Sequence, residues 1–308
     1  MRKYLVTGAA GFVGSAIAQR LVNEGHEVWT IDNLSTGFKA NIPKGVVFIE
    51  GDCQEIDSIR QLNGTKFNAI LHFAGQSSGE ISFDNPVYDL RTNTESTLRL
   101  ISYGLENGCD CFIYASSMSV YGEVEDKAIS EDHATKTLSF YGVGKLASEN
   151  YLRIYESMGL KPTSLRFFNV YGPGQNLRNL RQGMVSIFLA QLLKNDKVVV
   201  KGSLDRFRDF IFIDDCVNIV MGIIEDKHSY GGIYNVGTGV RTTVKMLLDK
   251  MMEISGVCKD IVIEKGTPGD QKGIYADISL AKSKLGFKYE YSLDEGLAKM
   301  ILWAKTFL

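Results

Sequence analysis

Residues 7–14 read Thr-Gly-Ala-Ala-Gly-Phe-Val-Gly, and this stretch decides the fold. It follows a strand-like run, Lys3–Thr7, and leads into an amphipathic run at 13–24. In such a strand–turn–helix unit, glycine lets the backbone approach a pyrophosphate, and the helix N-terminus offers it unpaired N–H groups and a positive dipole. The alternative interpretation is a turn with incidental glycines. We predict a dinucleotide site that includes Gly8, Gly11, Phe12, Val13 and Gly14.

Asp32 strengthens this prediction because it ends the next strand-like run, Glu27–Asp32. A carboxylate there accepts hydrogen bonds from the adenosine ribose hydroxyls and repels a 2′-phosphate, so NAD is favoured over NADP. The alternative is an aspartate in a solvated turn. Further polar or small residues follow this strand and the next one, and we expect them to border the adenosine: Asn33, Ser35, Thr36, Asp52 and Cys53.

The order of the elements predicts an α/β fold. Short β-rich runs at 3–7, 27–32, 46–50, 69–73, 111–116 and 163–168 alternate with helical patterns such as 13–24 and 87–106, as in a doubly wound parallel sheet covered by helices. After about residue 170 the connections lengthen, and helices are predicted at 184–194 and 243–255. We predict a nucleotide-binding domain at 1–170 and a smaller C-terminal α/β lobe at 171–308 that interleaves with it.

Composition excludes several other classes of protein. The 34 Lys and Arg residues nearly balance the 36 Asp and Glu residues, so the chain lacks the basic excess that nucleic acid or an anionic membrane attracts. No apolar run approaches the ~20 residues of a membrane helix, and no signal peptide is evident. The five cysteines form no CxxC pair and the four histidines lack metal spacing. We expect a cytoplasmic protein without a metal site.

A tyrosine and a lysine provide the candidate chemistry. Tyr141 and Lys145 lie four residues apart in a predicted helix, so both side chains face the same way. An ammonium and the positive nicotinamide ring would favour the phenolate; lowering its pKa by about 3 units needs roughly 4 kcal/mol. Ser116 and Ser117 follow an apolar strand, where ligands bind in α/β sheets. Ser117 can bridge the phenol and a substrate hydroxyl, although serines here can also be simple turn formers.

These residues and several further motifs resemble the extended short-chain dehydrogenase/reductase superfamily, specifically its nucleotide-sugar epimerase/dehydratase branch, over essentially the whole chain. The further motifs are Leu-His-Phe-Ala-Gly at 71–75, Asn93, Arg-Phe-Phe-Asn-Val-Tyr-Gly-Pro-Gly at 166–174 and Arg-Asp-Phe-Ile-Phe-Ile-Asp-Asp at 208–215. The resemblance implies a Rossmann-type domain that holds NAD and a lobe that binds a nucleoside-diphosphate sugar. It also implies hydride removal at sugar C4, with Tyr141 as base and Lys145 orienting the nicotinamide ribose.

The same resemblance assigns roles to further residues. It implies that the cofactor site also includes Phe73, Ala74, Gly75, Asn93, Ser116 and Phe168, with Asn93 supporting the active-site helix. It places Ser78, Ser117, Asn169, Arg208 and Asp270 at the substrate, and it implies a homodimer formed through helices at 87–106 and 141–155. Family members often carry Arg before Pro-Gly-Asp, where this chain has Thr267. Arg178 or Arg181 can replace that phosphate contact, unless their loop is merely solvated.

The residues after the candidate serine distinguish the possible reactions. The 4,6-dehydratases of this branch carry Thr-Asp-Glu where this chain has Ser117, Met118 and Ser119. Methionine donates no proton and serine is a poor acid at neutral pH, which argues against elimination of water. We therefore predict a nucleotide-sugar 4-epimerase. The alternatives are a 4-dehydrogenase or ketoreductase that releases a keto sugar, and a non-catalytic NAD-binding sensor, against which the intact Ser117, Tyr141 and Lys145 argue.

Overall fold

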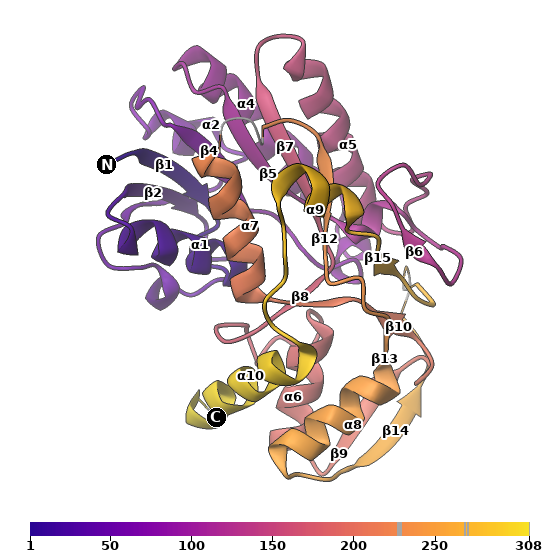
Figure 1. Cartoon of the computed structure of the whole chain (residues 1–308). Coiled ribbons are helices and arrows are strands. Elements are labelled where there is room, and N and C mark those ends of the chain that lie inside the picture. Colours follow the sequence, from indigo (N-terminus) through magenta and orange to yellow (C-terminus); the bar gives the residue numbers. More distant parts are fainter. Residues whose placement is uncertain (227–229, 268, 270, 308) are drawn as a thin grey trace.

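A parallel sheet of seven strands forms the centre of the computed structural model, which describes residues 1–226, 230–267, 269 and 271–307 (Figure 1). The strand order is β12-β7-β5-β4-β1-β2-β3. This arrangement confirms the predicted α/β fold class with a doubly wound sheet. The strands are β1 (Lys3–Thr7), β2 (Glu27–Asp32), β3 (Val47–Glu50), β4 (Ala69–His72), β5 (Cys111–Ser117), β7 (Lys161–Phe167) and β12 (Ile233–Val236).

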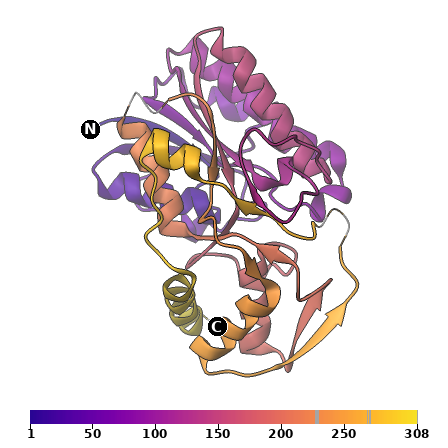
Figure 2. The ribbon, with the colours of Figure 1, turned by 45° about the vertical axis from the view of Figure 1, so that its right-hand side comes forward.

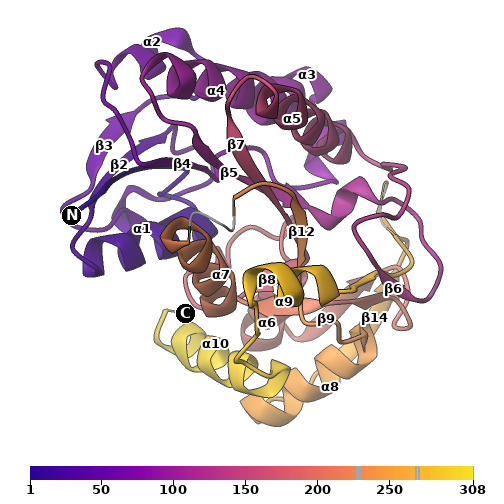
Figure 3. The same ribbon diagram turned by 45° about the horizontal axis from the view of Figure 1, so that its top comes forward.

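Helices cover both faces of the sheet, which explains why the central strands are almost wholly apolar. One face packs against α1 (Phe12–Asn23), α7 (Ile213–Glu225) and α9 (Ser279–Leu285). The other packs against α2 (Ile56–Arg60), α4 (Ser96–Glu106) and α5 (Phe140–Glu156). Figure 3 shows the two layers of helices on opposite sides of the sheet.

The second half of the chain divides between this sheet and a lobe with its own core. The lobe contains β9 (Lys197–Lys201) paired with β14 (Asp260–Glu264), and the helices α6 (Met184–Lys194), α8 (Val244–Ser255) and α10 (Leu293–Phe307) (Figure 2). By contrast, α7, β12 and α9 return to the main sheet, so the lobe is not one continuous segment. Short two-stranded pairs join the parts: β8 (Asn169–Tyr171) with β11 (Phe210–Phe212), β10 (Phe207–Arg208) with β13 (Thr242–Thr243), and β6 (Ala128–Ile129) with β15 (Tyr275–Ala276).

The helix predicted at 87–106 is interrupted. It consists of α3 (Pro86–Leu90), a π turn at Arg91–Glu95 and α4. In the sequence, Val87 and Leu90 fall near the same 3.6-residue period as Ile101 and Leu105, so a continuous helix would place them on its apolar face; they are instead 68% and 57% exposed. The wider π turn changes the phase between α3 and α4, and this phase shift explains the difference. No helix in the described part of the chain is long and apolar enough to cross a membrane.

Candidate active site

A cleft lies at the carboxyl ends of the central strands, where open α/β sheets bind ligands. Its walls come from the turn after β1, the ends of β2, β4 and β5, the start of α5 and the segment 167–185. The sheet domain and the connection toward the lobe therefore both contribute to the same site.

The glycine turn after β1 is shaped for close approach. Gly8 has a φ of +78°, and a Cβ there would lie 2.7 Å from the Ala74 amide nitrogen. A Cβ on Gly14 would lie 2.3 Å from the Gly8 carbonyl oxygen. Gly11 caps α1, and no described side chain caps this helix end, so its N–H groups remain available to an anion. All five predicted residues of this turn, Gly8, Gly11, Phe12, Val13 and Gly14, line the cleft.

Asp32 is held firmly at the end of β2. Its Oδ2 accepts a hydrogen bond from the Ala10 amide at 2.9 Å, and its Oδ1 accepts one from the Leu34 amide at 2.8 Å. These bonds fix the carboxylate beside the glycine turn, as an adenosine ribose would require. The other residues predicted around the adenosine, Asn33, Ser35, Thr36, Asp52 and Cys53, also line the cleft.

Helix α5 presents Tyr141 and Lys145 together at the cleft. Ser139 begins the helix by accepting a hydrogen bond from the Gly142 amide. The Lys145 Nζ lies 5.7 Å from the Tyr141 ring centre and 4.9 Å from that of Tyr114. Within the described residues this ammonium has no hydrogen bond or ion pair, which suits a ligand hydroxyl; burial lowers the pKa of Lys145 to about 8.

The ionisation of Tyr141 depends on more than the side chains around it. We expected Lys145 and the nicotinamide ring of NAD⁺ together to lower the pKa of the phenol; among the protein groups alone, burial raises the pKa of Tyr141 to about 12, against the opposing effect of its hydrogen bond with Ser117. The physical reason is that desolvation of the phenolate outweighs the neighbouring groups. The protein residues alone therefore keep the phenol protonated, and a further positive charge at the cleft is needed.

The wall beside the glycine turn is formed by the residues after β4 and the end of β5. Ser117 Oγ accepts a hydrogen bond from the Ser119 amide at 3.2 Å. The predicted residues Phe73, Ala74, Gly75, Ser116 and Phe168 line the cleft with it.

Asn93 lies behind this wall rather than in the cleft lining. Its side-chain amide donates to the Gln76 backbone carbonyl at 3.0 Å, and its backbone carbonyl accepts from the Ser148 hydroxyl of α5 at 2.8 Å. Asn93 therefore connects the π turn to the helix that carries Tyr141, and its predicted contact with the cofactor has no support from this position.

The predicted substrate residues divide between the cleft and the surrounding structure. Ser117 and Asn169 line the cleft, and the Asn169 Oδ1 is buried without a hydrogen-bond partner in the described chain. Arg208 is buried outside the lining, where it donates to the carbonyls of Phe207 and Gln271. Asp270 lies outside the described residues.

Contrary to our prediction, the loop 175–183 does not present Arg178 or Arg181 to the cleft as a phosphate contact. Arg181 forms ion pairs with Glu80 at 3.1 Å and Asp84 at 2.8 Å, and the Ser78 hydroxyl donates to the Arg181 carbonyl, so neither residue faces the cleft. Two carboxylates thus neutralise the guanidinium that we predicted for phosphate. Arg178 lines only a shallow hollow beside residues 34–38.

Sequence reasoning missed the amides of this loop. The cleft lining includes Asn176, Asn179 and Gln182, which occupy the same stretch as the two arginines. The sequence could have indicated them, because these amide side chains alternate with the arginines within 176–182. Amides can bind sugar hydroxyls without carrying a charge. No group of His, Cys, Asp and Glu in the described ranges is arranged to hold a metal ion.

Comparison with known proteins supports this interpretation of the cleft. The model of the NAD dependent epimerase/dehydratase family matches residues 4–237. The chain is 32% identical over 306 residues to a UDP-glucose 4-epimerase of Mycolicibacterium smegmatis, with 96% of both proteins covered.

Two solved structures are similar over nearly their whole length. One is the UDP-glucose 4-epimerase of Thermotoga maritima with UDP-glucose, at 32% identity, 99% coverage of both chains and a TM-score of 0.95. The other is the UDP-glucuronic acid 4-epimerase of Bacillus cereus with UDP-glucuronic acid and NAD, at 29% identity, with 99% of this chain and 100% of that chain covered and a TM-score of 0.90. The predicted superfamily, enzyme class and NAD cofactor are confirmed. The chain belongs to the NAD-dependent epimerase/dehydratase family.

Proposed function

We propose that this enzyme is a 4-epimerase of UDP-hexoses, with UDP-glucose and UDP-galactose as its substrate pair. The observation that carries the proposal is the assembly of Ser117, Tyr141 and Lys145 in one cleft, with Met118 and Ser119 where an elimination would need acids. The UDP-sugar 4-epimerases to which the chain is similar support the choice of nucleotide and of the C4 position.

The cleft fits NAD through groups that the protein leaves available. The glycine turn and the N-terminus of α1 suit the pyrophosphate, Asp32 suits the adenosine ribose, and the Lys145 ammonium suits the nicotinamide ribose. When bound, NAD⁺ accepts the C4 hydride and later returns it.

Proton transfer falls to the side chains of the protein. Tyr141 takes the proton of the C4 hydroxyl, with the Ser117 hydroxyl bridging phenol and substrate, while C4 becomes a ketone. For the reverse half, in which bound NAD would supply hydride to the opposite face of C4 once the sugar has turned, Tyr141 returns the proton to the C4 oxygen. Each electron pair and proton removed in the first half is restored in the second, so no external oxidant is consumed.

The experiment that tests this function follows the fate of the sugar. Purified holoenzyme is incubated with UDP-glucose, UDP-galactose, UDP-N-acetylglucosamine and UDP-glucuronic acid, and isomers and ketones are resolved by NMR and mass spectrometry. We expect interconversion of the first pair with no net NADH. Accumulation of a 4-keto sugar with NADH would instead identify a dehydrogenase, and a lack of turnover with every sugar would favour a sensor. The Tyr141→Phe variant should bind NAD and lose turnover.

We also propose that the enzyme is a homodimer. Helix α5 exposes the apolar side chains of Val143, Tyr151 and Ile154, and Met158 is exposed just after the helix ends. Helix α3, which packs against α5, exposes Val87 and Leu90. Contiguous apolar surface of this kind marks an interaction site, and a second copy of the chain offers a matching surface. All five cysteines are free, as expected for the reducing cytoplasm that we propose as its location.

A further inference from the structure

Asp89 is a buried carboxylate that the mechanism above does not use. It lies on α3 with 1% exposure, and its Oδ2 accepts a hydrogen bond from the side-chain amide of Gln76 at 2.7 Å. Its Oδ1 is buried without a hydrogen bond of normal geometry in the described structure, and Asp89 forms no ion pair there. A buried charge without a paired cation is unfavourable unless a nearby group compensates it.

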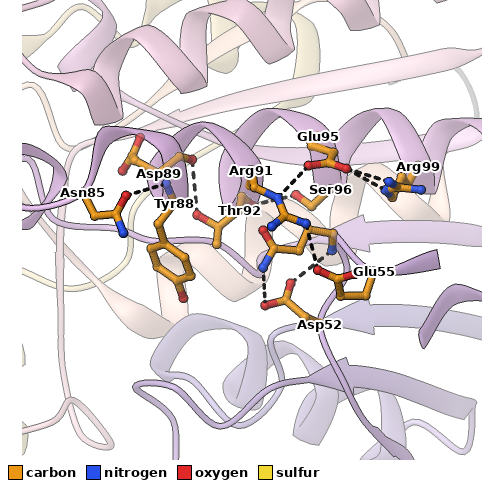
Figure 4. Close-up of polar contacts among 11 residues, drawn as sticks. Asp52, Glu55, Asn85, Tyr88, Asp89, Arg91, Thr92, Glu95, Ser96 and Arg99 are labelled. Carbon is orange, nitrogen blue, oxygen red and sulfur yellow. Dashed lines mark hydrogen bonds and ion pairs between the residues drawn. The ribbon is translucent and has the colours of Figure 1, made fainter. Parts of the chain in front are cut away.

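The contrast with Glu95, on the same helical segment, shows how unusual this is. Glu95 forms ion pairs with Arg91 at 3.0 Å and Arg99 at 2.6 Å, whereas the only contact drawn for Asp89 is its backbone carbonyl with Thr92 (Figure 4). The two carboxylates are six residues apart, but only Glu95 lies among arginines. If the Asp89 carboxylate is charged, a positive group other than these arginines must therefore stabilise it.

That source lies on α5, against which α3 packs. A Cβ placed on Gly144 would lie 3.4 Å from the Asp89 Oδ1. Gly144 immediately precedes Lys145, so the carboxylate rests against the helical turn that carries Tyr141 and Lys145. This distance is an ordinary van der Waals contact, so the carboxylate is in direct contact with this face of α5.

The other groups around Lys145 are neutral or already paired. Burial lowers the pKa of His72 on β4 to about 3 and raises that of Tyr114 on β5, so both are uncharged. Glu149 on α5 is paired with Arg166 of β7 at 2.7 Å. Of the negative charges around the Lys145 ammonium, the unpaired carboxylate of Asp89 therefore has the largest effect. It raises the pKa of Lys145 and so opposes the lowering of that pKa by burial.

We propose that Asp89 is a positioning residue of the active site, whose carboxylate keeps the Lys145 ammonium charged inside the cleft. This inference rests on the proposed function, since it deepens the role of Tyr141 and Lys145 there. Because a negative charge stabilises the protonated form of each neighbour, loss of Asp89 lowers the pKa of Lys145 and of Tyr141 together. Both limbs of the pH profile should then move toward lower pH.

The test compares the pH dependence of kcat in the wild-type holoenzyme, Asp89→Asn and the matched charge change Glu95→Gln. For Asp89→Asn we expect the alkaline limb to fall about one pH unit lower. With the pKa of Lys145 at about 8, this shift lowers the charged fraction of Lys145 about fivefold at pH 8 and changes it little at pH 6. The rate should therefore fall at pH 8, and the accompanying shift of the acid limb should leave the rate at pH 6 unchanged or higher. Glu95→Gln should leave the profile unchanged. A loss by the same factor at every pH, or no shift, would overturn the proposal.

A second variant of Asp89 and a direct titration of Lys145 complete the test. Asp89→Ser, which is smaller, replaces Asp89→Asn if the amide is not tolerated; if neither variant folds and binds NAD at pH 6, Asp89 is merely structural and the proposal fails. The titration of lysine labelled with ¹³C at Cε, assigned with Lys145→Arg, reads the Lys145 ionisation without turnover. It therefore tests Asp89 even if no nucleotide sugar is epimerised, which would refute the proposed function alone.

Discussion

The ionisation of Tyr141 should depend on the oxidation state of the bound cofactor. The pKa of the buried phenol is about 12 in the protein alone. Half-ionisation at pH 8 needs a drop of about 4 units, or about 5 kcal/mol. One positive charge about 4 Å away contributes about 4 kcal/mol at an effective dielectric constant near 20. The nicotinamide ring of NAD⁺ carries such a charge, and that of NADH does not.

The perturbation is therefore chemical reduction of the bound NAD⁺, with the protein unchanged. We expect the phenol of the oxidised holoenzyme to titrate at least about two pH units below that of the reduced form. The assay is tyrosinate absorbance against pH. Because the chain has 14 tyrosines, the Tyr141→Phe variant in the same oxidation state is subtracted to isolate one phenol.

The titration of Tyr141 in the two oxidation states decides whether the nicotinamide charge stabilises the phenolate. If Tyr141 titrated at the same pH in both oxidation states, the nicotinamide charge would not be the source of phenolate stabilisation. Proton removal would then have to be assigned to another group in the cleft. A shift confined to Tyr141, with the other tyrosines unaffected, would support the electrostatic account.

Three other predictions concern stability, cofactor binding and assembly. Glu149→Gln leaves the buried Arg166 guanidinium without its carboxylate partner and should lower the free energy of unfolding by about 3–5 kcal/mol, which corresponds to a melting temperature roughly 6–10 °C lower. The double variant Glu149→Leu/Arg166→Met removes both charges and should lose less stability. An equal loss in the two variants would contradict the charge argument. Gly14→Ala places a Cβ 2.3 Å from the Gly8 carbonyl oxygen and should reduce the NAD content of purified protein about tenfold or more. Its matched control is Gly222→Ala in α7, where nothing lies within 4 Å of the added Cβ. Equal NAD content in the two variants would show that the glycine turn after β1 does not need the space at position 14. Val143→Glu combined with Ile154→Glu should give a monomer by light scattering, whereas Leu302→Glu, on the equally exposed α10, should not change the mass; a dimer in the first variant would exclude the α5 surface as the interface.

The successes of sequence reasoning share a physical cause. The glycine turn, the strand that ends at Asp32 and the spacing of Tyr141 and Lys145 are local patterns, and backbone geometry converts them directly into positions. The strand order could also be anticipated in outline, because alternation of strands and helices restricts the possible topologies. These features brought the predicted cofactor residues of the first two strands and the proposed catalytic residues Ser117, Tyr141 and Lys145 to one cleft.

The failures concern partners that are distant in sequence. Arg181 looked available for phosphate, but Glu80 and Asp84, about a hundred residues away, neutralise it. Val87 and Leu90 looked buried, but a π turn changes their direction. Periodicity and composition carry no information about either effect.

Local patterns in the amino-acid sequence are sufficient for the strands of the sheet, the nucleotide turn and the pair of side chains on one helical face, since each depends on neighbours within a few residues. The packing of the folded chain settles which charges are paired and which are buried, and hence that burial raises the pKa of Tyr141 and that Asp89 lies against the helical turn that carries Lys145. The reason is that desolvation and Coulomb interactions act through space, and their balance exists only after the helices have packed.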